Sequence, residues 1–366
     1  MATIGRSVTI RRALVATAFL LTILFFLNRS HQTTPSPSAT TLNTDSSTQV
    51  SETFDKPGGG SIPPIADQKP LRDLSDLSLY EKLAYQYPYN VESKFPAYIW
   101  QTWKWTPAQA EFHFREQEAT WTVQHPGFVH EVITDAVAVH LLRVLYAPIP
   151  EVLEAYHSLP LPVLKADFFR YLILLARGGI YSDIDTFAIK SALEWIPKPV
   201  PRNSVGLVIG IEADPDRPDW ADWYSRRIQF CQWTIQSKPG HPVLREIVAR
   251  ITDETLKRKR DGSLLKMSDA SVVEFTGPAL WTDSIFEYFN DGRYFDKSVS
   301  EGEISWRNFT GMSKAKIVGD VAVLPITSFS PGVQQMGAKD YDDPMAFVKH
   351  DFEGTWKPEK LRHIGG

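Results

Sequence analysis

From about residue 95 onward, short apolar runs alternate with stretches of helical periodicity. Residues 97–102 and 129–133 are rich in aromatic and β-branched side chains, and residues 205–211 form an apolar run. Each of these segments predicts a strand. Residues 244–256 follow two prolines that suit the start of a helix. The alternation predicts an α/β domain over residues 95–366, in which ligands bind at the carboxyl ends of the strands.

One helical stretch, residues 164–177, is apolar on nearly every face and therefore predicts a buried helix. Asp167 and Arg170 interrupt it and lie three positions apart, which places them on one face. Buried charges are costly unless they are paired or used. The pattern leaves two interpretations open, a structural ion pair and a polar stripe that faces a ligand. Gly178 and Gly179 then predict the end of the helix.

Two carboxylates follow these glycines. A short strand at Ile180 and Tyr181 leads to Asp183 and Asp185, and alternate residues of an extended segment point to the same side. Paired carboxylates suit Mg²⁺ or Mn²⁺, with phosphate oxygens of a ligand completing the coordination. Most isolated Asp-x-Asp triplets are solvated loops. The position after a buried helix and a Gly-Gly stop favours the metal site here.

The N-terminus predicts a membrane anchor. Arg6, Arg11 and Arg12 precede an apolar run of 15 residues, 13–27, which as a helix spans about 22 Å. A bilayer core is about 30 Å thick, so the run is short. The basic flank, residues 1–12, is expected in the cytoplasm. A cleaved signal peptide is the alternative, but no Ala-x-Ala-like site follows the run. Both interpretations place the rest of the chain in the secretory lumen.

A stem is expected between the anchor and the folded domain, over residues 28–94. Residues 31–70 are rich in Ser, Thr, Pro and Gly and cannot bury enough apolar surface to offset their ordering entropy. Residues 71–87 have a weakly helical pattern that leads into the domain. The predicted order is a cytoplasmic tip, an anchor, a largely flexible stem and one globular domain.

Composition excludes several classes of protein. The chain has 366 residues, 43% of them hydrophobic, which excludes a wholly disordered chain. Lys and Arg number 39 against 43 Asp and Glu, a net charge of −4, so the broad positive surface of generic nucleic-acid binders is missing. Cys231 is the only cysteine, which excludes an intramolecular disulfide and a cysteine-based zinc cluster.

Residues 166–186 resemble the sugar-binding region of the Asp-x-Asp glycosyltransferases of family 32, which have a Rossmann-like nucleotide-sugar-binding domain of GT-A type. Further similar segments extend along most of the predicted domain: 99–104, 130–135, 210–214, 227–233, 237–242, 275–278 and 325–332. Together they are similar to the fungal α-1,6-mannosyltransferases of that family.

The resemblance implies a single-pass type II enzyme of the Golgi membrane, held by one helix. It implies transfer of mannose from GDP-mannose, with retention and with Mn²⁺ or another divalent cation, to the N-glycan core, where the outer chain begins. It leaves open a complex with other mannosyltransferases. Alternatives are a mannan-polymerase subunit or an enzyme that mannosylates inositol phosphoceramide. A non-catalytic luminal lectin is a further alternative, which the intact Asp-x-Asp pair disfavours.

The resemblance also implies roles for particular residues. Asp183 and Asp185 would be the catalytic pair that binds the metal and the diphosphate, and Asp167 and Arg170 would lie near the donor sugar. Residues near the nucleotide would be Gln101, Thr102 and Trp103, for which ordinary strand-end packing is the alternative; Trp100 is expected in the core.

The C-terminal segment is expected to complete the site. His350 suits a third metal ligand and Lys357 a contact with the diphosphate, as parts of a lid over the donor. A surface histidine in a tail is the alternative. No spacing singles out a nucleophile among three acids that suit a place near the anomeric carbon: Glu212, Asp214 and Asp283. Asn308 begins a glycosylation sequon.

The basic flank and the lack of a cleavage site predict the topology. Protease added to intact Golgi vesicles should spare everything beyond residue 27, because that part lies in the lumen. A mature protein that begins near Ser30 would instead show a cleaved signal peptide.

Overall fold

The computed structural model describes residues 74–266, 269–295 and 302–354, which belong to one compact unit, Pro70–Gly366. The expected anchor at 13–27, much of the expected stem and Lys357 lie outside the described residues. Within the described ranges, no helix is both long enough and apolar enough to cross a membrane.

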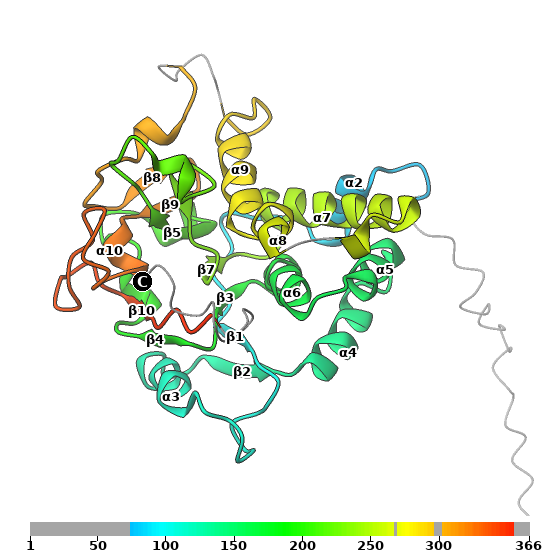
Figure 1. Ribbon diagram of the computed structural model, residues 1–366, viewed down its shortest axis with the longest axis horizontal. Helices are drawn as coiled ribbons and strands as arrows, with labels where there is room; N and C mark the ends of the chain where they lie inside the picture. The colour runs from blue at the N-terminus through cyan, green and yellow to red at the C-terminus, as the bar shows by residue number, and fades with distance from the viewer. Residues whose placement is uncertain (1–73, 267–268, 296–301, 355–366) are drawn as a thin grey trace, which may run out of the picture. The chain divides into compact units, whose positions relative to one another are not determined.

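A mixed sheet forms the centre of the molecule (Figure 1). Its strands run in the order β2-β1-β3-β7-β5-β9-β8, with β6 paired to β5. The β1–β2, β1–β3 and β5–β9 pairs are parallel, and the β3–β7, β5–β7, β5–β6 and β8–β9 pairs are antiparallel. The strand bounds are β1 Tyr98–Thr102, β2 Val129–Ile133, β3 Gly179–Ser182, β5 Leu207–Ala213, β6 Gln229–Phe230, β7 Thr234–Ser237, β8 Lys316–Val318 and β9 Val321–Leu324. The mixed α/β class predicted from sequence is confirmed, and the arrangement fits a GT-A type fold.

A small second sheet lies beside the central one. It pairs β4 (Thr186–Ala188) with β10 (Val348–His350) in antiparallel register, so the end of the described chain returns to the segment after β3. This pairing joins parts of the chain that are far apart in sequence.

Helices cover the central sheet (Figure 1). Helices α2, α5, α6 and α9 all pack against the long helix α7, and α8 packs on α9, while α3 and α10 contact β4 and β5, respectively. Helix bounds are α2 Leu79–Gln86, α3 Arg115–Gln124, α4 Asp135–Leu145, α5 Pro150–Ser158, α6 Pro162–Arg177, α7 Pro242–Asp261, α8 Asp269–Phe275, α9 Pro278–Phe289 and α10 Ile326–Phe329. Short 3₁₀ turns are Ala192–Glu194, Arg202–Ser204, Trp220–Asp222, Leu264–Lys266 and Trp306–Asn308.

Hydrophobic clusters form on both faces of the sheet because successive strand residues point in opposite directions. Trp100 and Tyr181 belong to the larger cluster, with α6 and α7. Ile99 and Ile180 belong to the second, with Trp121 of α3. The prediction that Trp100 lies in the core is confirmed, and its indole Nε1 donates to the Gly178 carbonyl at 2.9 Å.

Helix α6 is buried along most of its length, as its apolar pattern predicts. It ends at Gly178 and Gly179, whose φ angles of +64° and +98° are accessible mainly to glycine. A Cβ on Gly179 would lie 2.7 Å from the Tyr98 carbonyl oxygen. Glycine is therefore required where α6 turns directly into β3.

Most strand and helix predictions lie within about two residues of the observed elements. The segment 97–102 is β1, 129–133 is β2, and 205–211 corresponds to β5. The helix predicted at 244–256 lies inside the longer α7. The prediction that Asp183 and Asp185 lie in an extended segment is wrong. They lie in the turn between β3 and β4, where the chain leaves the central sheet for the second one. The two carboxylates still come together, with ligand atoms within 4.8 Å of each other.

Substitution of two glycines tests the close approach at the end of α6. Gly179→Ala should lower the free energy of unfolding by at least about 2 kcal/mol, because it combines a positive φ with a backbone clash. Gly262, which ends α7, also has a positive φ but open space around it, so Gly262→Ala should cost only about 1 kcal/mol. Urea unfolding of both variants measures the difference, and equal losses would contradict the role of the clash.

Candidate functional site

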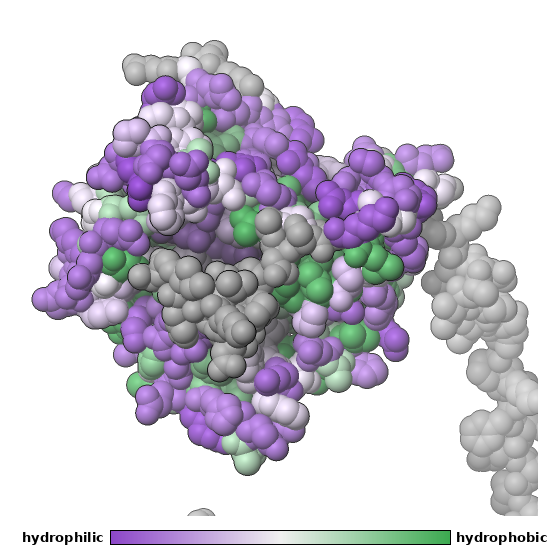
Figure 2. Space-filling model, viewed as in Figure 1, coloured by the Kyte–Doolittle hydropathy of each residue, from purple (hydrophilic) through white to green (hydrophobic). Residues whose placement is uncertain are grey.

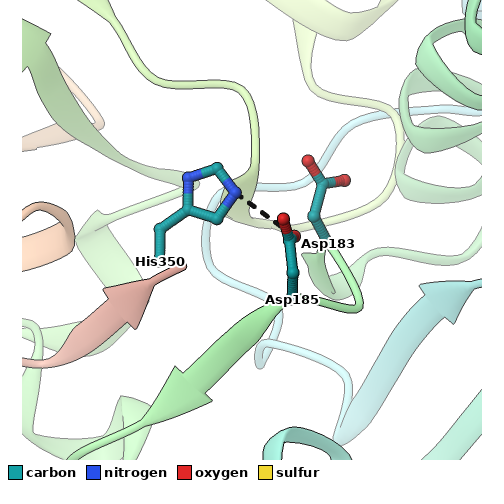
Figure 3. Close-up of side chains that lie close together, drawn as sticks. All are labelled: Asp183, Asp185 and His350. Carbon is teal, nitrogen blue, oxygen red and sulfur yellow. Dashed lines mark hydrogen bonds and ion pairs between the residues drawn. The ribbon is translucent and has the colours of Figure 1, made fainter. Parts of the chain in front are cut away.

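Three side chains with metal-ligating atoms meet at the turn after β3. Asp183 and Asp185 come from this turn and His350 from β10, and one ligand atom of each lies within 4.8 Å of the others. Figure 3 shows the His350 ring directed at the Asp185 carboxylate, with Nε2 at 3.2 Å from Oδ1. The structure thus brings together the three residues that the sequence assigned to the metal.

Backbone contacts fix the C-terminal segment on this turn. The Asp351 amide donates to the Asp185 carbonyl at 2.9 Å, and the Glu353 amide donates to the Asp185 carboxylate at 3.2 Å. Trp233 packs on the His350 ring with centroids 4.7 Å apart. His350 is therefore part of an ordered wall of the site, which disfavours the surface tail considered from sequence.

The donor set suits a divalent cation. Two carboxylates and an imidazole are ligands that Mn²⁺ and related ions accept. Nδ1 of His350 is buried and has no hydrogen-bond partner among the described residues. Nε2, the ring nitrogen that faces the Asp185 carboxylate, is the atom placed to join the two carboxylates as a ligand (Figure 3).

Burial and mutual charge shift the pKa values of all three groups. Burial raises the pKa of Asp183, and the nearby Asp185 charge adds to this against the opposing effect of Arg170. Burial also acts to raise the pKa of Asp185, but the charge and hydrogen bond of His350 outweigh it and hold that pKa below its usual range. Burial lowers and Asp185 raises the pKa of His350, with a net increase. Asp185 and His350 therefore stabilise each other's charged forms.

Arg170 connects the buried helix α6 to this cluster. Its Nη1 lies 2.8 Å from Asp167 and its Nη2 lies 2.9 Å from Asp183. Asp167 also accepts from the Thr276 hydroxyl at 2.8 Å and from the Gln232 amide at 3.3 Å. Burial, opposed by Arg170, raises the pKa of Asp167 to about 6. The ion-pair interpretation of Asp167 and Arg170 is thus confirmed, and Arg170 also contacts a metal-ligand candidate. The interpretation that the two residues face a ligand stays a prediction.

The residues expected near the nucleotide lie beside the turn in different settings. Gln101 is fully buried and bridges His130 Nε2, at 2.8 Å, and the Asp183 carbonyl, at 3.1 Å. Thr102 shares a hydrogen bond of 3.0 Å with the Tyr181 hydroxyl. Trp103 packs edge-on against Phe114. Gln101 therefore supports the backbone of the turn.

His130 was not among the site residues predicted from sequence. The parallel β1–β2 register explains its position. This register pairs Ile99 with His130 and brings the His130 imidazole to Gln101. Burial lowers the pKa of His130 to about 4, so its ring is neutral at pH 7. The pairing of β1 with β2 could have indicated His130, but strand pairing cannot be read from the local sequence pattern.

Of the three acids considered near the anomeric carbon, two are tied to other groups. Asp214 binds Arg227 at 2.9 Å and also accepts from Thr310 and the Gly311 amide. Asp283 pairs with Arg226 at 2.6 Å. Glu212, from the end of β5, retains a buried Oε2 without a hydrogen-bond partner among the described residues. The structure therefore separates Glu212 from the other two.

The face drawn in Figure 2 has a hollow lined by hydrophilic side chains in front of β5 and β7. Strand β7 pairs with β3, which leads into the metal turn, and β5 carries Glu212. Polar groups thus gather on this side of the sheet around the Asp-x-Asp turn. The arrangement suits a polar ligand that carries both phosphate and hydroxyl groups.

Comparison with known proteins identifies the family. A family model described as a glycosyltransferase sugar-binding region containing the DXD motif matches residues 112–200, which include Asp183 and Asp185. The initiation-specific α-1,6-mannosyltransferase of Candida albicans is 49% identical over 78% of this chain and 78% of its own length. This chain belongs to that family of glycosyltransferases. The resemblance stated from sequence is confirmed.

Other relatives agree. Proteins of the same name from Schizosaccharomyces pombe and Saccharomyces cerevisiae are 47% and 36% identical, over 75% and 79% of this chain and 66% and 83% of their own lengths. Among solved structures, the PaToxG glycosyltransferase aligns with a TM-score of 0.38 at 15% identity, over 59% of this chain and 76% of that chain. A DXD glycosyltransferase implies a divalent cation and a nucleotide-sugar donor.

Neutralising Asp167 tests the Arg170 bridge. In Asp167→Asn, Arg170 loses one of its two carboxylate partners, so its positive charge acts more strongly on Asp183. The turn should therefore bind a divalent cation more weakly, by about tenfold or more. Titration of the protein with Mn²⁺, followed by the electron paramagnetic resonance of the free ion, measures this affinity. Asp253→Asn, on the exposed face of α7, is the matched control. Unchanged cation affinity in Asp167→Asn would show that the bridge does not act on the metal turn.

Proposed function

We propose that this glycosyltransferase transfers mannose from GDP-mannose in α-1,6 linkage to the N-glycan core, and so begins the outer chain. The observation that carries the proposal is the Asp183–Asp185–His350 cluster, in a chain 49% identical to a relative named for this activity. Mn²⁺ is the proposed cation, because two carboxylates and an imidazole suit it better than they suit Mg²⁺, which prefers oxygen ligands alone.

Residues in and around the turn have different roles in binding the donor. Asp183, Asp185 and His350 would hold the cation, which when bound supplies a positive charge beside the leaving diphosphate. Arg170 fixes the Asp183 carboxylate by a 2.9 Å contact, and Gln101 fixes the Asp183 carbonyl. The metal-ligating side chains are thus already ordered in the folded protein, so donor binding does not have to order them.

Retention of the anomeric configuration is part of the proposal, because an α-linked donor gives an α-linked product. It requires either a covalent intermediate on a carboxylate or attack on the same face assisted by the leaving phosphate. Asp214 and Asp283 are already engaged by arginines, which makes them poor nucleophiles. Of the three acids considered, Glu212 is the one that no arginine among the described residues engages, so both routes remain part of the proposal.

We also propose that the enzyme is a single-pass type II protein of the Golgi membrane with its catalytic domain in the lumen. The support is the basic flank and the apolar run at residues 13–27, which lie outside the described residues. A short span suits the thinner membranes of the early secretory pathway. A complex with other mannosyltransferases is compatible with this placement.

Removal of the metal tests the proposal. EDTA should abolish mannosyl transfer from GDP-mannose to a defined N-glycan core, and added Mn²⁺ should restore it. Asp185→Asn should lower kcat by at least about 10²–10³-fold, since it removes one ligand charge. The fold should survive with a lower melting temperature, because the substitution removes the charge that His350 and the Glu353 amide stabilise. Asp253→Asn again serves as the control.

Three results would contradict parts of this proposal. Full turnover in EDTA would remove the metal mechanism. Transfer to inositol phosphoceramide but not to an N-glycan core would assign a different acceptor. Binding of glycans without hydrolysis or transfer of GDP-mannose would indicate a lectin.

A further inference from the structure

Glu212 occupies an irregular position in the sheet. The β5–β6 register pairs Ile211 with Phe230 and Ala213 with Gln229, and it shifts between these two pairs, where Glu212 lies. Such bulges redirect a side chain and are frequent beside active sites. Glu212 is also the partly exposed member of an otherwise buried strand. The local geometry thus turns a carboxyl group out of the regular pleat.

The carboxyl of Glu212 is close to the metal cluster and incompletely satisfied. Burial raises its pKa to about 7, while a hydrogen bond from Gln229 and the charges of His350 and Arg170 act in the opposite direction. Its Oε2 has no hydrogen-bond partner among the described residues, and neither has Oε1 of Gln229. Two neighbouring side chains therefore each keep one unused, buried oxygen.

Unused buried oxygens are destabilising for a fold, because each loses its bonds to water and gains none. The other acids of this region are satisfied: Asp167 by Arg170 and Thr276, and Asp214 by Arg227. An unsatisfied buried group needs an explanation, and a ligand that completes it is one such explanation beside a candidate active site. The contrast with these neighbours points to a ligand that binds at Glu212 and Gln229.

We propose that Glu212 and Gln229 together bind hydroxyl groups of a sugar during the transfer reaction. A sugar hydroxyl donates one hydrogen bond, which the free Glu212 Oε2 or Gln229 Oε1 accepts, and no covalent step is involved. The inference rests on the proposed function for the identity of the substrates. The hydroxyls belong either to the mannosyl ring of the donor or to the acceptor glycan, and the experiment separates these two sources.

The test compares binding of GDP and of GDP-mannose by calorimetry in the presence of Mn²⁺, for wild type, Glu212→Gln and Glu212→Ala. GDP affinity should be unchanged in both variants. If the pair binds the donor sugar, GDP-mannose affinity should fall about ten- to a hundredfold. If it binds the acceptor, GDP-mannose affinity should hold and the KM for the glycan should rise by a similar factor. Either pattern supports the proposal.

Stability provides the second readout. Glu212→Gln conserves volume and removes no ion pair of the described residues, so the melting temperature should be unchanged or higher. Glu246→Gln, which changes a surface partner of Arg250 on α7, is the matched control and should leave all binding constants unchanged. Unchanged constants for GDP, GDP-mannose and the glycan in both Glu212 variants would overturn the proposal. So would a lower melting temperature with an equal loss of GDP affinity, which would indicate a purely structural role.

A failure of the proposed function looks different in this experiment. Wild-type protein would then bind GDP no more tightly than other nucleotides, or would ignore GDP-mannose while binding another nucleotide sugar. The comparison of nucleotide with nucleotide sugar can be repeated with that donor. The role of Glu212 is therefore tested separately from the identity of the sugar.

Discussion

The site depends on one buried cation, the guanidinium of Arg170. It lies between Asp167 on its own helix and Asp183 on the metal turn, at 2.8 and 2.9 Å. Removing one partner of a buried ion pair is strongly destabilising, because the remaining charge stays buried without compensation. Helix α6 therefore cannot shift relative to the turn without separating these charges. The rigidity of a hydrophobic helix is in this way transmitted to a polar site.

A second constraint comes from the far end of the chain. Pairing of β10 with β4 places His350 opposite Thr186, directly after the turn, and backbone amides of residues 351 and 353 bind Asp185. The third ligand candidate therefore reaches the site only when the C-terminal segment pairs with β4. Asp183 is held from the helix side and Asp185 from the C-terminal side. The two carboxylates thus have separate supports although they are two positions apart.

The sequence predicted those parts of this arrangement that depend on local chemistry. The apolar pattern of α6, the Gly-Gly stop and the paired carboxylates are all visible within residues 164–185, and the structure contains each of them. The turn geometry of Asp183 and Asp185 was predicted wrongly, because a strand period cannot show where the chain leaves one sheet to start a second one. The burial of Gln101 depends on His130 from a neighbouring strand, and local pattern does not contain strand register.

The same reason explains why the sequence did not distinguish Glu212 from Asp214 and Asp283. The groups that satisfy Asp214 and Asp283 come from residues 226, 227, 310 and 311, which only tertiary folding brings near them. Glu212 differs from the other two acids because they have charged partners among the described residues and it does not. The sequence shows which residues are acidic, but only the structure shows which of them lack a partner.

Charge balance links the folded protein to its ligands. Without a cation, His350 and Arg170 offset the charges of Asp185 and Asp183, which keeps two adjacent carboxylates compatible with burial. The Asp185 charge raises the pKa of His350 against the effect of burial, so the proton on its ring is part of this balance. An imidazole that holds a metal must be deprotonated, so a cation held by this cluster would displace any proton on the His350 nitrogen that faces it. The diphosphate of the proposed donor would add negative charge at the same place, so cation and donor would each favour the binding of the other. The charged groups that balance one another in the turn are thus the ones that would couple the proposed cation to the proposed donor.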